Sequence, residues 1–164
     1  MNVVFLLLGS NLDDRYALIG RARDEISSKV GRITRTSLIY ESEPWGFSAN
    51  QPFLNQVITV ETELKPAVIL EKILNIEKEL GRKRDLLRRY TSRLIDIDIL
   101  FFNDEIINEA NLVIPHPGIP DRMFTLIPLS ELDGSFIHPG SFKSILEMIS
   151  ECPDRLNVYP YQPS

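Results

Sequence analysis

The 164-residue sequence has little of several features that define other classes of protein. Its one cysteine, Cys152, excludes an internal disulfide and is typical of a cytoplasmic protein. No apolar run approaches the roughly 20 residues that a membrane helix requires. Lys and Arg total 18 against 23 Asp and Glu, and the net charge is -5, so we expect no nucleic-acid partner and no membrane partner.

The start of the chain is apolar but does not resemble a signal peptide. The run over residues 1–8 lacks a basic start and a small-residue cleavage site, and it stops at Gly9. We interpret it as a buried central strand. With 43% hydrophobic and 25% charged residues, the composition predicts one globular domain over residues 1–164, and we take a monomer as the default.

The order of the residue patterns predicts an α+β fold. After the first strand, Asn11 or Asp13 can cap a helix that runs to about Lys29. The further predicted elements are a strand within 32–42, a strand over 53–62, a helix over 66–81 and a strand over 94–102. This βαββαβ order is the ferredoxin-like arrangement, an antiparallel sheet with helices packed on it. C-terminal additions follow as a helix over 123–132, a helix over 142–149 with Leu146 buried, and an irregular tail from residue 153.

The strand over 94–102 carries two carboxylates, Asp96 and Asp98. Strict alternation along the strand places the two carboxylates on one face, about 7 Å apart. It places Phe101 on the other face, together with Ile95, Ile97 and Ile99. The two carboxylates could simply mark a solvated face. Leu94 and Leu100 on the same face make that reading weaker, because paired anions in a partly apolar setting need a cation. Mg²⁺ is the ion that suits two carboxylates together with water and phosphate oxygens.

Residues 82–93 contain six of the 18 basic residues, namely Arg82, Lys83, Arg84, Arg88, Arg89 and Arg93. A charge run is often only a solvated surface. Its place directly before the two carboxylates also suits a polyphosphate clamp, because guanidinium groups match phosphate oxygens. We expect this segment to close over a bound nucleotide.

The stretch from Arg89 to Leu100, where basic residues lead into Asp96-Ile97-Asp98, resembles the signature of a known family, the 6-hydroxymethyl-7,8-dihydropterin pyrophosphokinases of folate biosynthesis. The stretch from Arg89 to Leu100 fits the family signature at all but one place, where Thr91 replaces Gly or Ala. Further matches lie at residues 8–12, 51–55, 115–117 and 122–124, so the resemblance covers most of the chain.

The resemblance implies an ATP-dependent enzyme that transfers pyrophosphate to the hydroxymethyl group of the pterin and releases AMP. It implies two Mg²⁺ ions held by Asp96 and Asp98. The implied catalytic residues are these two aspartates together with Arg84 and Arg93. The implied ATP-binding residues are Leu70, Glu77, Arg84, Arg93, Ile99, His116 and Arg122. The implied pterin-binding residues are Ser42, Pro44, Trp45, Phe53, Asn55 and Phe124.

Several readings stay open beside this one. Glu77 could be a plain helix-surface residue, and His116, between two prolines, could be structural. Tyr90 and Asn111 stand where relatives often carry Trp and Arg. The domain could instead be an RNA-binding module or a nucleotidyl transferase that releases pyrophosphate.

Overall fold

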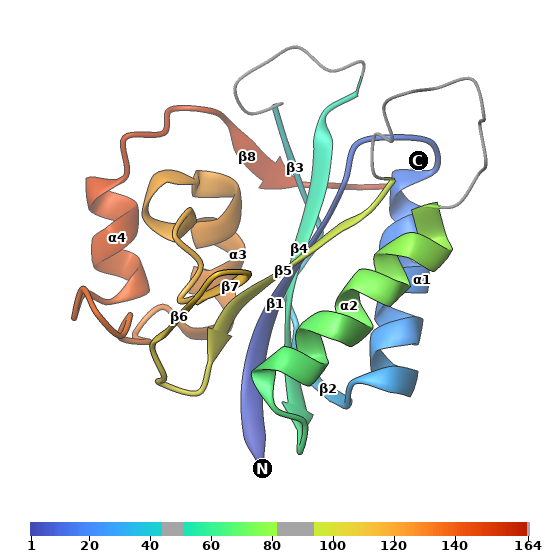
Figure 1. Cartoon of the computed structure of the whole chain (residues 1–164). Coiled ribbons are helices and arrows are strands. Elements are labelled where there is room, and N and C mark those ends of the chain that lie inside the picture. The colour runs from blue at the N-terminus through green and yellow to red at the C-terminus, as the bar shows by residue number, and fades with distance from the viewer. Residues whose placement is uncertain (44–50, 82–93, 164) are drawn as a thin grey trace.

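The computed structural model of the protein describes residues 1–43, 51–81 and 94–163 (Figure 1). Its elements in chain order are β1 (Asn2–Ser10), α1 (Arg15–Lys29), β2 (Arg32–Thr36), β3 (Tyr40–Ser42), β4 (Phe53–Thr62), α2 (Pro66–Gly81), β5 (Asp96–Phe102), β6 (Ile107–Glu109), β7 (Leu112–Ile114), η1 (Ile119–Asp121), α3 (Met123–Asp133), α4 (Ile145–Glu151) and β8 (Val158–Pro160). No helix in these ranges is long and apolar enough to cross a membrane.

The main sheet confirms the predicted ferredoxin-like core. Its strands run in the order β5-β1-β4-β3-β8, with β2 also paired to β4, and each of these pairings is antiparallel. The buried strand predicted at the start of the chain is β1, which lies between β5 and β4. Strands β6 and β7 form a separate hairpin after β5.

Helices cover both faces of the sheet (Figure 1). Helices α1 and α2 pack on the face that carries Val4, Leu6 and Leu8 of β1. The C-terminal additions, α3 and α4, pack on the other face, against Phe5 and Leu7. Side chains alternate along each strand, so β1 contributes one set of residues to each hydrophobic core.

The helix predicted over 66–81 is confirmed as α2. Pro66 begins it, because a first-turn residue needs no backbone N–H, and Ile69, Ile73, Ile76 and Leu80 form its buried stripe. Helix α1 is capped by Asp14 rather than by the expected Asn11 or Asp13, and the Asp14 carboxylate accepts a hydrogen bond from the Ala17 backbone N–H.

Strand β5 departs from the strict alternation that the sequence predicts. Its register against β1 shifts next to Phe5, which leaves Leu100 as an extra residue. Phe101 therefore packs edge-on against Phe5, on the face opposite Ile97 and Ile99. The predicted shared face of Phe101 and the isoleucines is wrong, because a β-bulge reverses the direction of the side chains beyond it.

Three further expectations are corrected. The strand expected within 32–42 is two strands, β2 and β3, separated where Ser37 bonds β4 through both its backbone and its hydroxyl group. Helix α4 begins at Ile145 rather than at residue 142, and Leu146 is exposed. The tail is tied down, because β8 pairs with β3.

The contact between Gly31 and β4 gives a test of this packing. A Cβ atom at Gly31 would collide with the Glu61 carbonyl oxygen. We expect Gly31→Ala to lower the free energy of unfolding by about 1–3 kcal/mol, the usual cost of overpacking. At Gly81 an added Cβ meets no atom within 4 Å, so Gly81→Ala should change stability by less than about 1 kcal/mol. Urea denaturation of both variants measures the difference, and equal stabilities would contradict the collision.

Candidate active site

A row of neighbouring residues crosses three strands of the sheet at one end. Asp96 of β5 lies opposite Gly9 of β1, and Gly9 lies opposite Asn55 of β4. Asp98 lies opposite Leu7, one step further along the same face. This is the face that α3 and α4 cover, so the register places the predicted carboxylates and the predicted pterin-binding amide on one face, on either side of β1.

Gly9 leaves a hollow in the centre of this row. A Cβ atom there would lie 2.9 Å from the Asn55 Oδ1 atom, closer than ordinary packing allows. Asn55 is buried, and its Nδ2 atom donates a hydrogen bond of 3.1 Å to the buried Ser42 hydroxyl. That bond fixes the amide, so Oδ1 faces the hollow beside Gly9.

The hollow opens into a cavity of about 270 Å³, which we call the ring pocket. It is lined by Leu7, Gly9, Phe53, Asn55, Asp96, Asp98, Arg122 and Phe124. Six of these residues are predicted site residues that come from three separate stretches of the chain. Phe53 and Phe124 are both half-buried, so each offers an aromatic ring to a flat molecule.

The start of α3 forms one wall of the ring pocket. The Arg122 guanidinium lies 5.8 Å from the centre of the Phe124 ring, a cation–π distance. The backbone N–H of Met123, between these two residues, donates a hydrogen bond of 2.9 Å to the buried Asp154 carboxylate. A residue of the tail thus caps the helix whose first turn lines the pocket.

A second cavity of about 300 Å³ lies next to the first, and we call it the His116 pocket. Its lining residues are Leu70, Ile97, Asp98, Ile99, Ala110, Asn111, Leu112, Val113, His116 and Pro117. Three of the predicted ATP-binding residues, Leu70, Ile99 and His116, meet here. Asp98 lines both cavities, so this carboxylate stands where the two pockets adjoin.

The imidazole of His116 has a defined orientation. Its Nδ1 atom accepts a hydrogen bond of 2.9 Å from the Gly118 backbone N–H, so the proton of the neutral ring is on Nε2, which lies 3.9 Å from the Asp98 carboxylate. Burial lowers the pKa of His116, Asp98 opposes that change, and Arg122 lowers the pKa further. The neutral ring can still donate a hydrogen bond through Nε2.

Two of the predicted ATP-binding residues, Arg122 and Glu77, do not line the His116 pocket. Arg122, expected at ATP, lines the ring pocket. Glu77 lines neither the ring pocket nor the His116 pocket. Its carboxylate accepts a hydrogen bond of 2.9 Å from the backbone N–H of Ile97, the residue between Asp96 and Asp98. Four predicted site residues lie outside the described residues, namely Pro44, Trp45, Arg84 and Arg93, as does the expected clamp over 82–93.

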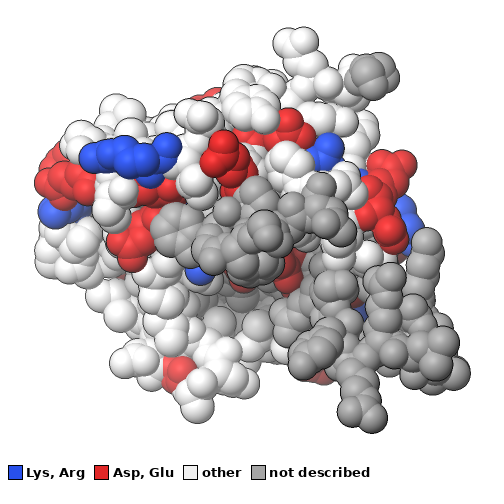
Figure 2. Space-filling view, turned by 90° about the horizontal axis from the view of Figure 1, so that it is seen from above, with Lys and Arg blue, Asp and Glu red and all other residues white. Residues whose placement is uncertain are grey.

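The two carboxylates of β5 suit a Mg²⁺ ion that is also bound to a phosphate group. Within the described ranges no group of three His, Cys, Asp or Glu side chains could hold a metal ion. Asp96 and Asp98 provide two carboxylates, and Mg²⁺ commonly takes one or two from the protein while water and phosphate oxygens complete its shell. Figure 2 shows acidic and basic side chains mixed over the described part of this end of the molecule.

Three features of the two pockets were not among the predicted site residues, namely Gly9, Asp154 and the wall that residues 110–113 form. Gly9 carried a signal, because it interrupts the apolar run that opens the chain. No sequence signal pointed to Asp154, because its hydrogen-bond partner Met123 is 31 residues away in the chain. Asn111, which departs from the pattern of the resembling family, lines the His116 pocket.

Fold and site together define a ferredoxin-like α+β domain with two adjoining small-molecule pockets and a pair of aspartates at their junction. The chain belongs to the 7,8-dihydro-6-hydroxymethylpterin-pyrophosphokinase (HPPK) family, whose family model matches residues 5–134. This confirms the resemblance inferred from the motifs.

Individual relatives cover the chain to different extents. It is 42% identical over 141 residues to 2-amino-4-hydroxy-6-hydroxymethyldihydropteridine pyrophosphokinase of Porphyromonas gingivalis. The aligned residues make up 85% of this chain and 95% of that protein. It is 38% identical over 160 residues to the folic acid synthesis protein fol1 of Pneumocystis carinii. There the aligned residues make up 98% of this chain but only 21% of that protein. The structure of Plasmodium falciparum HPPK-DHPS with pteroate has a similar fold, with a TM-score of 0.73 and 20% identity over 92% of this chain and 42% of that one.

The hollow at Gly9 yields a prediction for the ring pocket. Gly9→Ala should raise the dissociation constant for a hydroxymethyl pterin by about tenfold or more, because the new methyl group displaces the Asn55 amide. Gly20→Ala is the control, since a Cβ there meets only the end of the Arg23 side chain at 3.7 Å. Fluorescence titration measures both affinities, and normal pterin binding by Gly9→Ala would contradict the assigned role of the hollow.

Proposed function

We propose that this chain transfers pyrophosphate from ATP to 6-hydroxymethyl-7,8-dihydropterin, giving the pterin diphosphate and AMP in folate biosynthesis. One observation carries the proposal, namely that Asp98 lines both the ring pocket and the His116 pocket. A pterin in the first and a nucleotide in the second would bring the hydroxymethyl oxygen and the triphosphate together at this carboxylate. The names of the relatives support the same reaction.

The ring pocket suits the pterin. A pterin is a flat heteroaromatic ring, and Phe53 and Phe124 can hold it between them, each ring contact adding about 0.5–1.5 kcal/mol beyond area burial. The Asn55 Oδ1 atom accepts a hydrogen bond from the amide edge of the pterin, because its Nδ2 atom is already bonded to Ser42. This arrangement orients the hydroxymethyl arm toward the aspartates.

The His116 pocket suits the nucleotide. Leu70 and Ile99 offer apolar contacts to an adenine ring, and the Nε2–H group of His116 donates to a phosphate oxygen. Arg122 lies on the side of the ring pocket, where its charge can stabilise the group being transferred. We further propose that Arg84 and Arg93 bind the triphosphate and that Glu77 acts by holding the β5 backbone between the aspartates.

Asp96 and Asp98 would hold two Mg²⁺ ions together with the triphosphate. When bound, the ions neutralise phosphate charge and polarise the phosphorus centre. The residues of this chain fix the two substrates against each other, and such alignment can lower a barrier by roughly 7–11 kcal/mol. No covalent intermediate with the protein is required.

We also propose that residues 1–164 form a single domain that works as a monomer in the cytoplasm. The pairing of β8 with β3 supports one domain, because it joins the C-terminal tail to the first half of the chain. Light scattering that gives the mass of one chain in solution would agree with the monomer, and a larger mass would refute it.

Product analysis tests the proposed reaction. The purified chain is incubated with Mg-ATP and 6-hydroxymethyl-7,8-dihydropterin, and the products are separated by chromatography. Equal amounts of AMP and pterin diphosphate are expected. Release of free pyrophosphate would instead indicate a nucleotidyl transferase, and no turnover would overturn the proposal.

The metal assignment predicts a large effect of Asp98→Asn. This change removes a charged oxygen ligand while it nearly keeps the side-chain shape, so we expect turnover to fall by at least about 100-fold with the fold intact. Asp104→Asn, at an exposed turn just after the same strand, is the matched control and should react normally. Chelation of Mg²⁺ should abolish wild-type turnover, and near-normal turnover by Asp98→Asn would refute the assignment.

The aromatic pair predicts a selective loss of pterin affinity. Phe53→Ala should weaken pterin binding by about tenfold and leave the affinity for a non-hydrolysable ATP analogue within about twofold, because only one ligand loses a ring contact. Phe142→Ala is the control, since that side chain is 80% exposed. Calorimetric titration separates the two ligands, and equal losses for both would show that Phe53 only supports the fold.

A further inference from the structure

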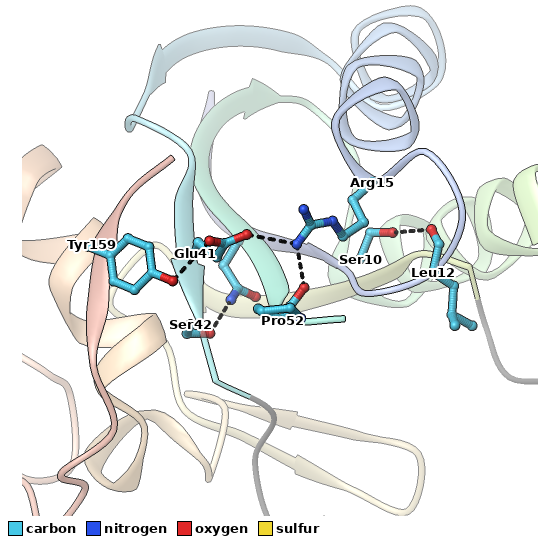
Figure 3. A network of polar contacts seen from close by, with 8 residues as sticks. Ser10, Leu12, Arg15, Glu41, Ser42, Pro52 and Tyr159 are labelled. Carbon is cyan, nitrogen blue, oxygen red and sulfur yellow. Dashed lines mark hydrogen bonds and ion pairs between the residues drawn. The ribbon is translucent and has the colours of Figure 1, made fainter. Parts of the chain in front are cut away.

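The first residue of α1, Arg15, bonds the ends of two strands that border the ring pocket (Figure 3). Its Nη1 atom donates a hydrogen bond of 2.9 Å to the Glu41 carboxylate and another of 2.7 Å to the Pro52 carbonyl oxygen. Glu41 directly precedes Ser42 in β3, and Pro52 directly precedes Phe53 in β4. One nitrogen atom therefore joins the backbone neighbours of two predicted pterin-binding residues.

Arg15 acts from the far side of the sheet. Glu41 alternates with Ser42 along β3, so its side chain points to the face that α1 and α2 cover, whereas Ser42 points to the face of the ring pocket. Arg15 lines neither the ring pocket nor the His116 pocket. Any influence of Arg15 on a ligand in the ring pocket must pass through the strands themselves.

The surroundings of Arg15 favour a strong and specific contact. The side chains of Arg15 and Glu41 are only 14% and 17% exposed, so solvent screens this ion pair less than a surface pair. The guanidinium lies 5.6 Å from the centre of the Tyr161 ring. The Tyr159 hydroxyl donates a hydrogen bond of 2.9 Å to the other Glu41 oxygen, as Figure 3 shows.

The register of the sheet carries this contact to the pocket. Ser42 lies opposite Phe53 in the pairing of β3 with β4, and Tyr40 lies opposite Asn55 two residues further along. The Ser42 hydroxyl in turn holds the Asn55 amide. A change in the separation of β3 and β4 at this end therefore shifts both the aromatic wall and the amide that faces the hollow.

We propose that Arg15 is a positioning residue for the pterin site, which it sets by holding Glu41 and Pro52 at a fixed separation. The inference rests on the proposed function, because it concerns the pterin pocket of that reaction. The guanidinium can meet a carboxylate, a carbonyl oxygen and an aromatic ring at once, which the single ammonium group of lysine does less well. Arg15→Lys should therefore restore only part of the pterin affinity that Arg15→Ala loses.

Calorimetric titration of the full chain tests the proposal with two probes, 6-hydroxymethylpterin and a non-hydrolysable ATP analogue with Mg²⁺. Arg15→Ala and Glu41→Gln should each raise the pterin dissociation constant by about tenfold and change that of the ATP analogue by less than about twofold. The double variant should lose little more than Arg15→Ala alone, because the two side chains act as one unit. Tyr159→Phe, which keeps both Arg15 contacts, should lose less than about threefold.

The possible outcomes separate this inference from the proposed function. Unchanged pterin affinity in Arg15→Ala, strictly additive losses in the double variant, or equal losses for both ligands would each overturn the positioning role. If Arg15→Ala does not fold, as judged by circular dichroism, Glu41→Gln and Arg15→Lys still carry the test. A wild-type chain that binds no pterin would overturn the proposed function, and this inference with it.

Discussion

The pairing of β5, β1 and β4 in one register is the constraint on which the site depends. It puts a glycine between a carboxylate and an amide, so that Asp96, Gly9 and Asn55 form a row with an empty centre. A shift of one residue between β5 and β1 would turn the aspartates toward the α1 and α2 face, and a shift of one residue between β4 and β1 would turn Asn55 away from Gly9. Backbone hydrogen bonds in the middle of the sheet therefore determine where the residues of the candidate site meet.

The two faces of the sheet have different roles. On one face α1 and α2 bury the aliphatic stripe of β1 and provide much of the hydrophobic stabilisation. On the other face α3 covers only part of the sheet, and its first turn brings Arg122 and Phe124 over the uncovered part. Asp154 fixes that turn from the tail. The additions to the ferredoxin-like core thus line the candidate site.

Much of this arrangement follows from local sequence patterns. The apolar run of β1, the stripe of α2 and the alternation around Asp96 and Asp98 each depend on neighbouring residues, so periodicity predicts them. The bulge at Leu100 was not predictable, because it arises from the pairing with β1 rather than from β5 alone. The pairing of β8 with β3 and the bonds of Arg15 likewise join residues far apart in the chain. The motifs indicated candidate residues for the site, but only the fold shows that Asp98 lines both pockets.

A carboxylate that lines two pockets also links their binding equilibria. A ligand in the ring pocket changes the electrostatic potential that a ligand in the His116 pocket meets at Asp98, and the converse holds equally. Thermodynamic linkage requires the factor by which the nucleotide alters pterin affinity to equal the factor by which the pterin alters nucleotide affinity. If the two substrates bind as proposed, Asp98 therefore couples their affinities, and the coupling free energy is the same whichever substrate binds first.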